Sequence, residues 1–127
     1  MSQATNYLEN KIAGHVFGGT AYTAPTTLYV GLYKTAPNDT GAGTEVSGGS
    51  YARQSMAFTV TGDTASNTAN VEFPKATGSW GTVTHFAISD AVSGGNMLCY
   101  GTLTASKTVA SGDTLRFNAG ELDITVA

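Results

Sequence analysis

Residues 79–103 read SWGTVTHFAISDAVSGGNMLCYGTL, and this stretch decides the fold. Two runs rich in β-branched and aromatic residues flank the turn Ser93-Gly94-Gly95, whose glycines supply the positive φ of a tight turn. The pattern predicts a β-hairpin. Both faces of both runs are largely apolar or small, so we expect the hairpin to lie at the centre of a sheet rather than at its edge.

Strict alternation along these two runs predicts which side chains share a face of the sheet. In the first run, Val83 is expected on the face opposite to Phe86 and Ile88. In the second run, Met97 is expected on the same face as Cys99. The only tryptophan, Trp80, lies at the entrance to the hairpin.

Shorter alternating segments surround the hairpin and carry turn signals between them. Strands are expected at 27–34, 51–60, 67–73, 107–110, 114–117 and 122–126. Strands at this spacing are typical of a β-sandwich or barrel. Residues 1–127 are therefore predicted to form a single all-β domain, an antiparallel β-sandwich or barrel-like fold with one short N-terminal helix.

The helix is expected at 6–17. Asn6 can cap its start, Glu9 follows three residues later, and Gly18-Gly19 ends it. The apolar side chains on one face of this helix are those of Leu8, Ile12 and Val16. Because so short a helix is marginal alone, this face must dock on something, and the subunit's own sheet is favoured over a neighbouring subunit.

The surface is expected to be neutral and rich in hydroxyl groups. Charged residues make up only 12% of the chain, while it holds twenty threonines, seventeen alanines and sixteen glycines. The net charge of −3 argues against binding to nucleic acid, which requires a basic patch. No stretch approaches the ~20 apolar residues that span a bilayer, so no membrane partner is expected.

The beginning of the sequence carries no basic segment followed by an apolar run, so no signal peptide is expected. The single cysteine, Cys99, lies inside a predicted strand and is interpreted as a buried structural thiol. Both observations favour synthesis and assembly in a reducing cytoplasm.

No arrangement of residues predicts catalysis, a metal site or a cofactor. The two histidines and Cys99 lack metal-ligand spacing. Alternation puts His85 and Asp90 on opposite faces of a strand, and there is no Gly-x-Ser-x-Gly nucleophile motif. An enzyme is therefore not expected, and His85 is interpreted as a hydrogen-bonded core or interface residue.

The candidate contact region is the loop at about 36–50, which is rich in glycine and small polar residues. A merely mobile loop is the alternative. Arg53 is interpreted either as a clamp on this loop within the subunit or as a contact to a neighbour's carboxylate. The residues expected at an interface are Tyr29, Tyr33, Glu45, Tyr51 and Arg53.

Two classes of function remain open on these residues. One is a structural assembly subunit, whose low surface charge desolvates readily at protein contacts. The other is a lectin-like carbohydrate-binding module. Its candidate aromatic sugar platform is formed by Trp80, Tyr29, Tyr33 and Tyr100.

Five segments in order resemble a family of small tailed-bacteriophage virion structural proteins. They are 6–12 (NYLENKI), 28–33 (LYVGLY), 45–54 (EVSGGSYARQ), 80–86 (WGTVTHF) and 112–117 (GDTLRF). The resemblance implies a virion location, with either a capsid decoration (cement) role or a tail-fibre or minor-tail role. It implies no catalytic residues.

A capsid decoration subunit that stabilises the head is the favoured expectation, because 127 residues hold no repeats or coiled-coil stalk for an elongated fibre. The tail-fibre or minor-tail role is the alternative. The expected partners are copies of the same chain, most plausibly in a trimer, and the major capsid protein or other virion proteins.

Overall fold

The computed structural model describes residues 2–125, and it confirms the antiparallel β-fold with one short helix. The central hairpin is present as β7 (Gly81–Ser89) and β8 (Met97–Val109). Both strands have neighbours on each side, in the order β1-β8-β7-β2-β3. The other strands of this sheet are β1 (Ser2–Ala4), β2 (Leu28–Tyr33) and β3 (Gln54–Met56).

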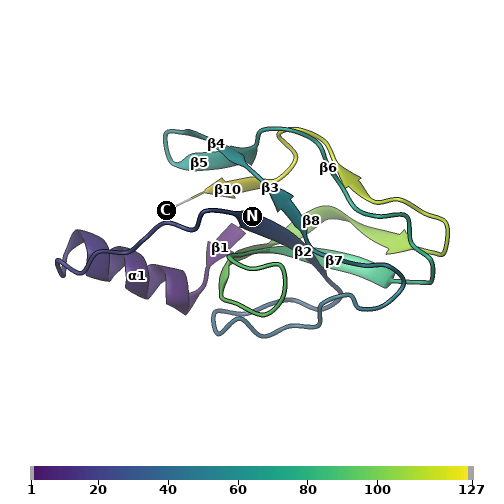
Figure 1. The fold of residues 1–127 in the computed structure, drawn as a ribbon, viewed down its shortest axis with the longest axis horizontal. Coiled ribbons are helices and arrows are strands. Elements are labelled where there is room, and N and C mark those ends of the chain that lie inside the picture. The colour runs from purple at the N-terminus through teal and green to yellow at the C-terminus, as the bar shows by residue number, and fades with distance from the viewer. Residues whose placement is uncertain (1, 126–127) are drawn as a thin grey trace.

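A second layer faces this five-stranded sheet (Figure 1). It contains a three-stranded sheet in the order β10-β5-β4 and a two-stranded pair of β6 with β9. Its strands are β4 (Phe58–Thr61), β5 (Thr64–Asn67), β6 (Val71–Glu72), β9 (Arg116–Phe117) and β10 (Asp123–Thr125). All pairings between named strands are antiparallel. Because the two layers pack around one shared core, the molecule is an antiparallel β-sandwich.

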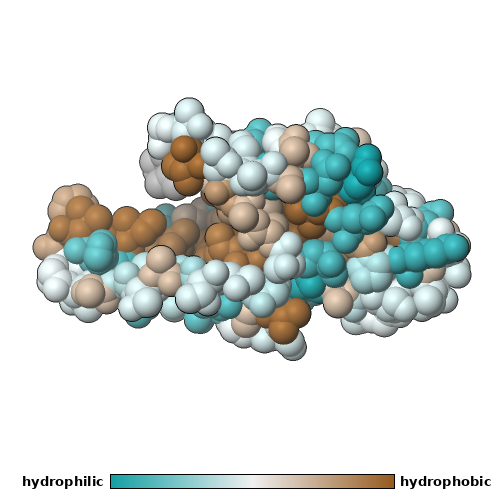
Figure 2. All heavy atoms as spheres, turned by 45° about the horizontal axis from the view of Figure 1, so that its top comes forward, coloured by the Kyte–Doolittle hydropathy of each residue, from teal (hydrophilic) through white to brown (hydrophobic). Residues whose placement is uncertain are grey.

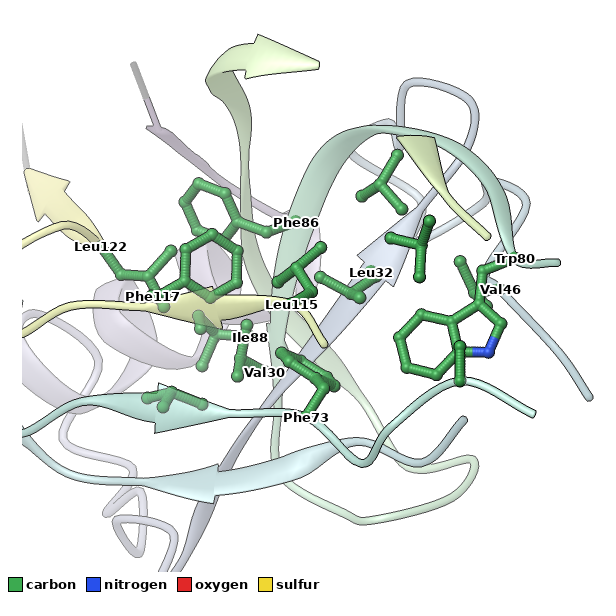
Figure 3. Close-up of a cluster of buried hydrophobic side chains, with 14 of the residues drawn as sticks. Val30, Leu32, Val46, Phe73, Trp80, Phe86, Ile88, Leu115, Phe117 and Leu122 are labelled. Atoms are coloured by element: carbon green, nitrogen blue, oxygen red, sulfur yellow. The ribbon is translucent and has the colours of Figure 1, made fainter. Parts of the chain in front are cut away.

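The core fills the space between the two layers (Figure 3). Val30, Leu32 and Ile88 point into it from the five-stranded sheet, while Phe73 and Phe117 come from the opposite layer. Trp80 is 2% exposed, and its Nε1 donates a hydrogen bond to the Gly49 carbonyl at 2.8 Å. The entrance to the hairpin is therefore fixed in the core.

Two irregularities in the pairing of β7 with β8 overturn the predicted alternation. A register shift between Val83 and His85 rotates Val83 into the same core as Phe86, and Val83 is fully buried there. A second shift, between Ile88 and Ser89, puts Met97 on the opposite face from Cys99. An inserted residue reverses the facing of everything beyond it, so simple alternation fails at both points.

Several strand boundaries also differ from expectation. Of the strand expected at 67–73, Asn67 ends β5, which was not expected, and only Val71–Glu72 form a strand, β6. The segment expected at 51–60 is divided at Ala57 into β3 and β4, which belong to different sheets. Residues 107–109 continue β8 instead of forming a separate strand. The sequence analysis missed β1, which pairs with the edge of β8 through Gln3↔Tyr100 and its neighbours.

The helix is α1 (Asn6–Val16), and Phe17 caps its C-terminus. Its N-cap is Thr5, and the expectation of Asn6 in that role was wrong by one residue. The Thr5 hydroxyl accepts from Leu8 N at 3.4 Å and donates to Met97 O at 2.6 Å. Thr5 therefore caps the start of the helix and also fastens it to β8. No helix among residues 2–125 is long and apolar enough to span a membrane.

The helix docks on the subunit's own sheet only at its attached end, where it contacts β8 and β1, so the expectation holds there alone. None of its residues is buried, and it extends away from one end of the sandwich (Figure 1). Leu8 is half-buried at the attached end, whereas Ile12 and Val16 are 38% and 60% exposed. The apolar face follows helical spacing as predicted, but the body of the subunit covers little of it.

Candidate interaction surfaces

Three of the five residues expected at an interface form one cluster inside the subunit, which we call the clamp: Glu45, Tyr51 and Arg53. Arg53 binds the Glu45 carboxylate through two parallel bonds, Nε to Oε2 at 2.8 Å and a terminal guanidinium nitrogen to Oε1 at 2.9 Å. The Tyr51 hydroxyl donates to the same Oε2 at 2.6 Å. Side-chain exposure of Arg53 and Glu45 is only 10% and 25%, so water screens this pair weakly.

The clamp also completes the edge of β2. Strand β3 pairs with β2 only from Leu28 to Val30. Beyond that point, Leu32 N donates to the Tyr51 hydroxyl at 2.9 Å, and Val46 N donates to Leu32 O at 2.9 Å. Loop residues therefore satisfy the backbone groups that would otherwise form an open sheet edge.

Glycine at position 31 lets the clamp lie directly over the β2 backbone. A Cβ on Gly31 would lie 2.8 Å from Glu45 Oε2 and 3.2 Å from the Tyr51 hydroxyl oxygen. The sequence analysis missed this residue. The only available signal was a glycine inside an otherwise strong strand, which marks a site of close approach.

Burial raises the pKa of the Tyr51 phenol above its usual range, and the hydrogen bond to Glu45 raises it further. An ionised Tyr51 would place a second negative charge against the carboxylate it now donates to. The Glu45 hydrogen bond also raises the pKa of Arg53. Tyr51 therefore stays a neutral donor throughout the physiological range.

Arg53 additionally ties the clamp to the turn of the central hairpin. One of its terminal guanidinium nitrogens donates to the Ala91 carbonyl at 2.9 Å and to the Gly94 carbonyl at 3.0 Å. The guanidinium is thus used within the subunit, which agrees with the interpretation of Arg53 as an intramolecular clamp.

Tyr29 and Tyr33 lie on the outer face of β2. Tyr33 is 5% exposed and packs with Ala87 and Met97, with Tyr100 against them. Tyr29 is half-buried and pairs in register with Ser55 and Ser89. Tyr29 and Tyr33 therefore lie on the same face of β2 as Gly31, over which the clamp packs.

The loop at about 36–50 has a defined hydrogen-bonded course. Asn38 Oδ1 accepts from the backbone N–H groups of Thr40 and Ala42 at 3.0 and 3.2 Å, which folds the tip into a turn. Lys34 N donates to Thr44 O at 2.8 Å, and Val46 is buried. The loop is thus fastened to β2 at its return.

The proposed sugar platform does not form as one surface. Trp80 and Tyr33 are buried in two different clusters, the main core and the smaller cluster of Tyr33, Ala87 and Met97. Tyr29 and Tyr100 remain half-buried, and the Tyr100 hydroxyl lies 2.7 Å from Asp39 Oδ1 and 2.8 Å from Gln3 Oε1, both of which accept. The Trp80 ring is therefore buried and is not available to stack on a sugar, as the lectin interpretation requires.

His85 lines a hollow of about 600 Å³ together with Tyr100, Asp39 and Gln3. Its Nδ1 lies 2.7 Å from the Thr84 hydroxyl. Asp90 bonds instead to Asn96, through the backbone N at 2.7 Å and the side-chain amide at 3.1 Å. Within residues 2–125 no group of three or more potential metal ligands is gathered.

Cys99 is predicted to resist thiol reagents in the folded protein. Burial raises the pKa of its thiol to about 12, so at pH 8 only about one molecule in 10⁴ carries the reactive thiolate. Alkylation with iodoacetamide should be at least a hundredfold slower than in the urea-unfolded chain. The folded state holds the Cys99 proton more tightly than the unfolded chain does. The contribution of the protonated thiol to the free energy of unfolding is therefore complete below pH ~8.5, and it is lost as the pH rises towards 12. Fast labelling under native conditions would contradict the buried placement.

The exposed face of α1 borders a groove of about 480 Å³, which we call the helix groove. Leu8, Ile12 and Phe17 line it from the helix, and Cys99 and Ile124 line it from the body. Phe17, which the sequence analysis did not single out, is 88% exposed. Figure 2 shows apolar surface gathered along this side of the helix. The exposed side chains of Ile12, Val16 and Phe17, which we call the ridge, therefore lie beside the helix groove.

Comparison with known proteins identifies one family. A family model described as "Podophage GP4 fiber I protein gp80" matches residues 3–125. A search of curated proteins finds no match. Because nearly the whole β-sandwich, including the clamp and α1, lies within the matched residues, the chain belongs to the family of the podophage GP4 fiber I protein gp80, a family of tailed-phage virion structural proteins.

Proposed function

We propose that this virion structural protein is a subunit of a tail fibre. The observation that carries the proposal is the match to a fibre protein family over residues 3–125. It supports the tail-fibre alternative more than capsid decoration, which was the favoured expectation from sequence. A fibre subunit need not be elongated when a small β-sandwich is one module of a larger assembly.

The proposed role is structural and not catalytic. The clamp residues bond to one another, and Asp90 bonds to Asn96 rather than to His85. The proposed partners are copies of the same chain and other virion proteins. A surface with few charged groups supports such contacts because little hydration is lost when they form. The net charge of −3 supports protein partners over nucleic acid.

The proposal is tested by locating the protein in intact particles. Antibody-gold labelling is expected on the tail, and particles that lack the protein are expected to adsorb poorly while keeping normal resistance to heat and osmotic shock. Labelling of the head, together with heat-sensitive capsids and normal adsorption, would overturn the fibre role and restore capsid decoration.

A further inference from the structure

We propose that α1 is a self-association element, and that the helix of one copy docks against the helix groove of the next. The proposal rests on self-association of this fibre subunit and goes beyond it by naming the surface. It begins from the apolar residues of α1 that the described subunit leaves exposed.

Packing within the described subunit does not account for the stability of so short and exposed a helix. An isolated helix of 11 residues is marginal in water, and its stability in proteins comes from packing an apolar face. Here Ile12, Val16 and Phe17 are 38%, 60% and 88% exposed. Ile12 and Phe17 line the helix groove, and helical spacing puts Val16 on the same stripe as Ile12. Figure 2 shows apolar surface gathered along this part of the molecule. Such a continuous exposed apolar surface marks a contact site.

The charges around the groove favour a second copy of the same chain as its occupant. The charged residues that line the groove are Glu9 and Asp39, both acidic. Asp39 is held at the rim by the Tyr100 hydroxyl. On the same helix, Lys11 flanks the apolar stripe on the side opposite to Glu9, as the 100° rotation per residue requires. Its exposed Nζ lies 5.6 Å from the centroid of the Tyr7 ring, whereas His15 on the same side is used within the subunit, where its Nδ1 accepts from Tyr22 N at 3.1 Å. Each copy thus provides an acidic-edged apolar hollow and an apolar ridge with a basic edge.

The same charges favour parallel over antiparallel packing of the helices from neighbouring copies. When copies are related by rotation with their helices parallel, the Lys11 flank of one helix faces the Glu9 flank of the next. When two copies pair through antiparallel helices, like flanks meet and the charges repel. The charge pattern therefore favours a closed ring of parallel helices, which a trimer satisfies.

The first experiment uses two exposed valines as a matched pair. Val16→Asp puts a charge on the proposed ridge, whereas Val60→Asp puts the same charge at a 70% exposed position on β4. In sedimentation equilibrium on the intact chain, we expect Val16→Asp to weaken self-association at least tenfold and Val60→Asp to change it less than twofold. Circular dichroism confirms that both variants remain folded. Equal association by both variants, or a wild-type protein that stays monomeric at all concentrations, overturns the proposal.

The second experiment tests the charge pairing. Glu9→Lys and Lys11→Glu are each expected to weaken association several-fold, and the double variant is expected to recover most of the loss. Single variants without effect, or a double variant weaker than both, would rule out parallel packing through these flanks. If wild-type oligomers persist in every variant, the surface is wrong while the fibre role stands. Head labelling of particles would remove the fibre role without affecting this test.

Discussion

Replacing Trp80 by alanine is expected to lower the free energy of unfolding by about 3–5 kcal/mol. The ring is 2% exposed and makes edge-to-face contacts with Tyr51 and Phe73, at centroid distances of 5.4 and 6.4 Å. Alanine would leave a cavity where the hairpin entrance meets the core, and the Gly49 carbonyl would lose one of its two donors and keep the other, Thr77 N. Urea unfolding followed by circular dichroism measures the loss without depending on tryptophan fluorescence.

A more conservative variant separates packing from hydrogen bonding. Trp80→Phe keeps most of the apolar contact but removes the Nε1–H donor, so we expect a smaller loss of about 1–3 kcal/mol. Val60→Ala, at an exposed position, provides the control and should change stability little. A loss below ~1 kcal/mol for Trp80→Ala would contradict a core role for this ring.

The second large effect is expected at the clamp. Glu45→Ala should lower the free energy of unfolding by about 2–3 kcal/mol, below the 3–5 kcal/mol of a fully buried pair because Glu45 is 25% exposed. The substitution removes the carboxylate that accepts from both Arg53 and Tyr51, and it leaves the guanidinium charge without its anionic partner. Thermal and chemical denaturation should report the same destabilisation.

A double-mutant cycle isolates the pair itself. Glu45→Ala combined with Arg53→Ala should cost less than the sum of the single variants, because the second change removes a charge that the first left unpaired. Glu72→Ala supplies an exposed glutamate as control, and it should have little effect. Additive single effects at positions 45 and 53 would mean that the ion pair contributes nothing to folding.

The central hairpin was predictable because its signals are local. The turn at Ser93-Gly94-Gly95 and the apolar flanks lie within a few residues of one another, and the structure places β7 and β8 at the centre of the sheet. The two facing errors have one physical cause. A bulge is an insertion in the pairing of two strands, and neither strand's own alternation reveals it, so Val83 and Met97 were assigned to the wrong faces.

The helix shows the same division between local and distant information. Its extent followed from spacing and from the glycines after it, within one residue at the C-terminal end. What the helix packs against depends on the direction in which the chain leaves Thr5, and that direction is set by bonds to Met97 and Leu98. Contacts across such a distance leave no periodic pattern in the sequence.

At the clamp, the sequence identified the partners but not their arrangement. Glu45, Tyr51 and Arg53 stand close together in a chain with few charges, which made an internal contact reasonable. Their position over Gly31, and their role as a substitute for a strand at the edge of β2, arise only when the loop returns to the sheet.

The attachment of α1 also sets the order of events during synthesis. Strand β1 and Thr5 bind residues 97–101, which are made more than ninety residues later. On the ribosome, a nascent chain therefore lacks the partner that orients its helix until most of the sandwich has been translated, and contacts this distant form late in folding. The ridge and the hollow beside it acquire their shared geometry only in a nearly finished polypeptide. The docking surface proposed for α1 is therefore complete only after residues 97–101 have been made.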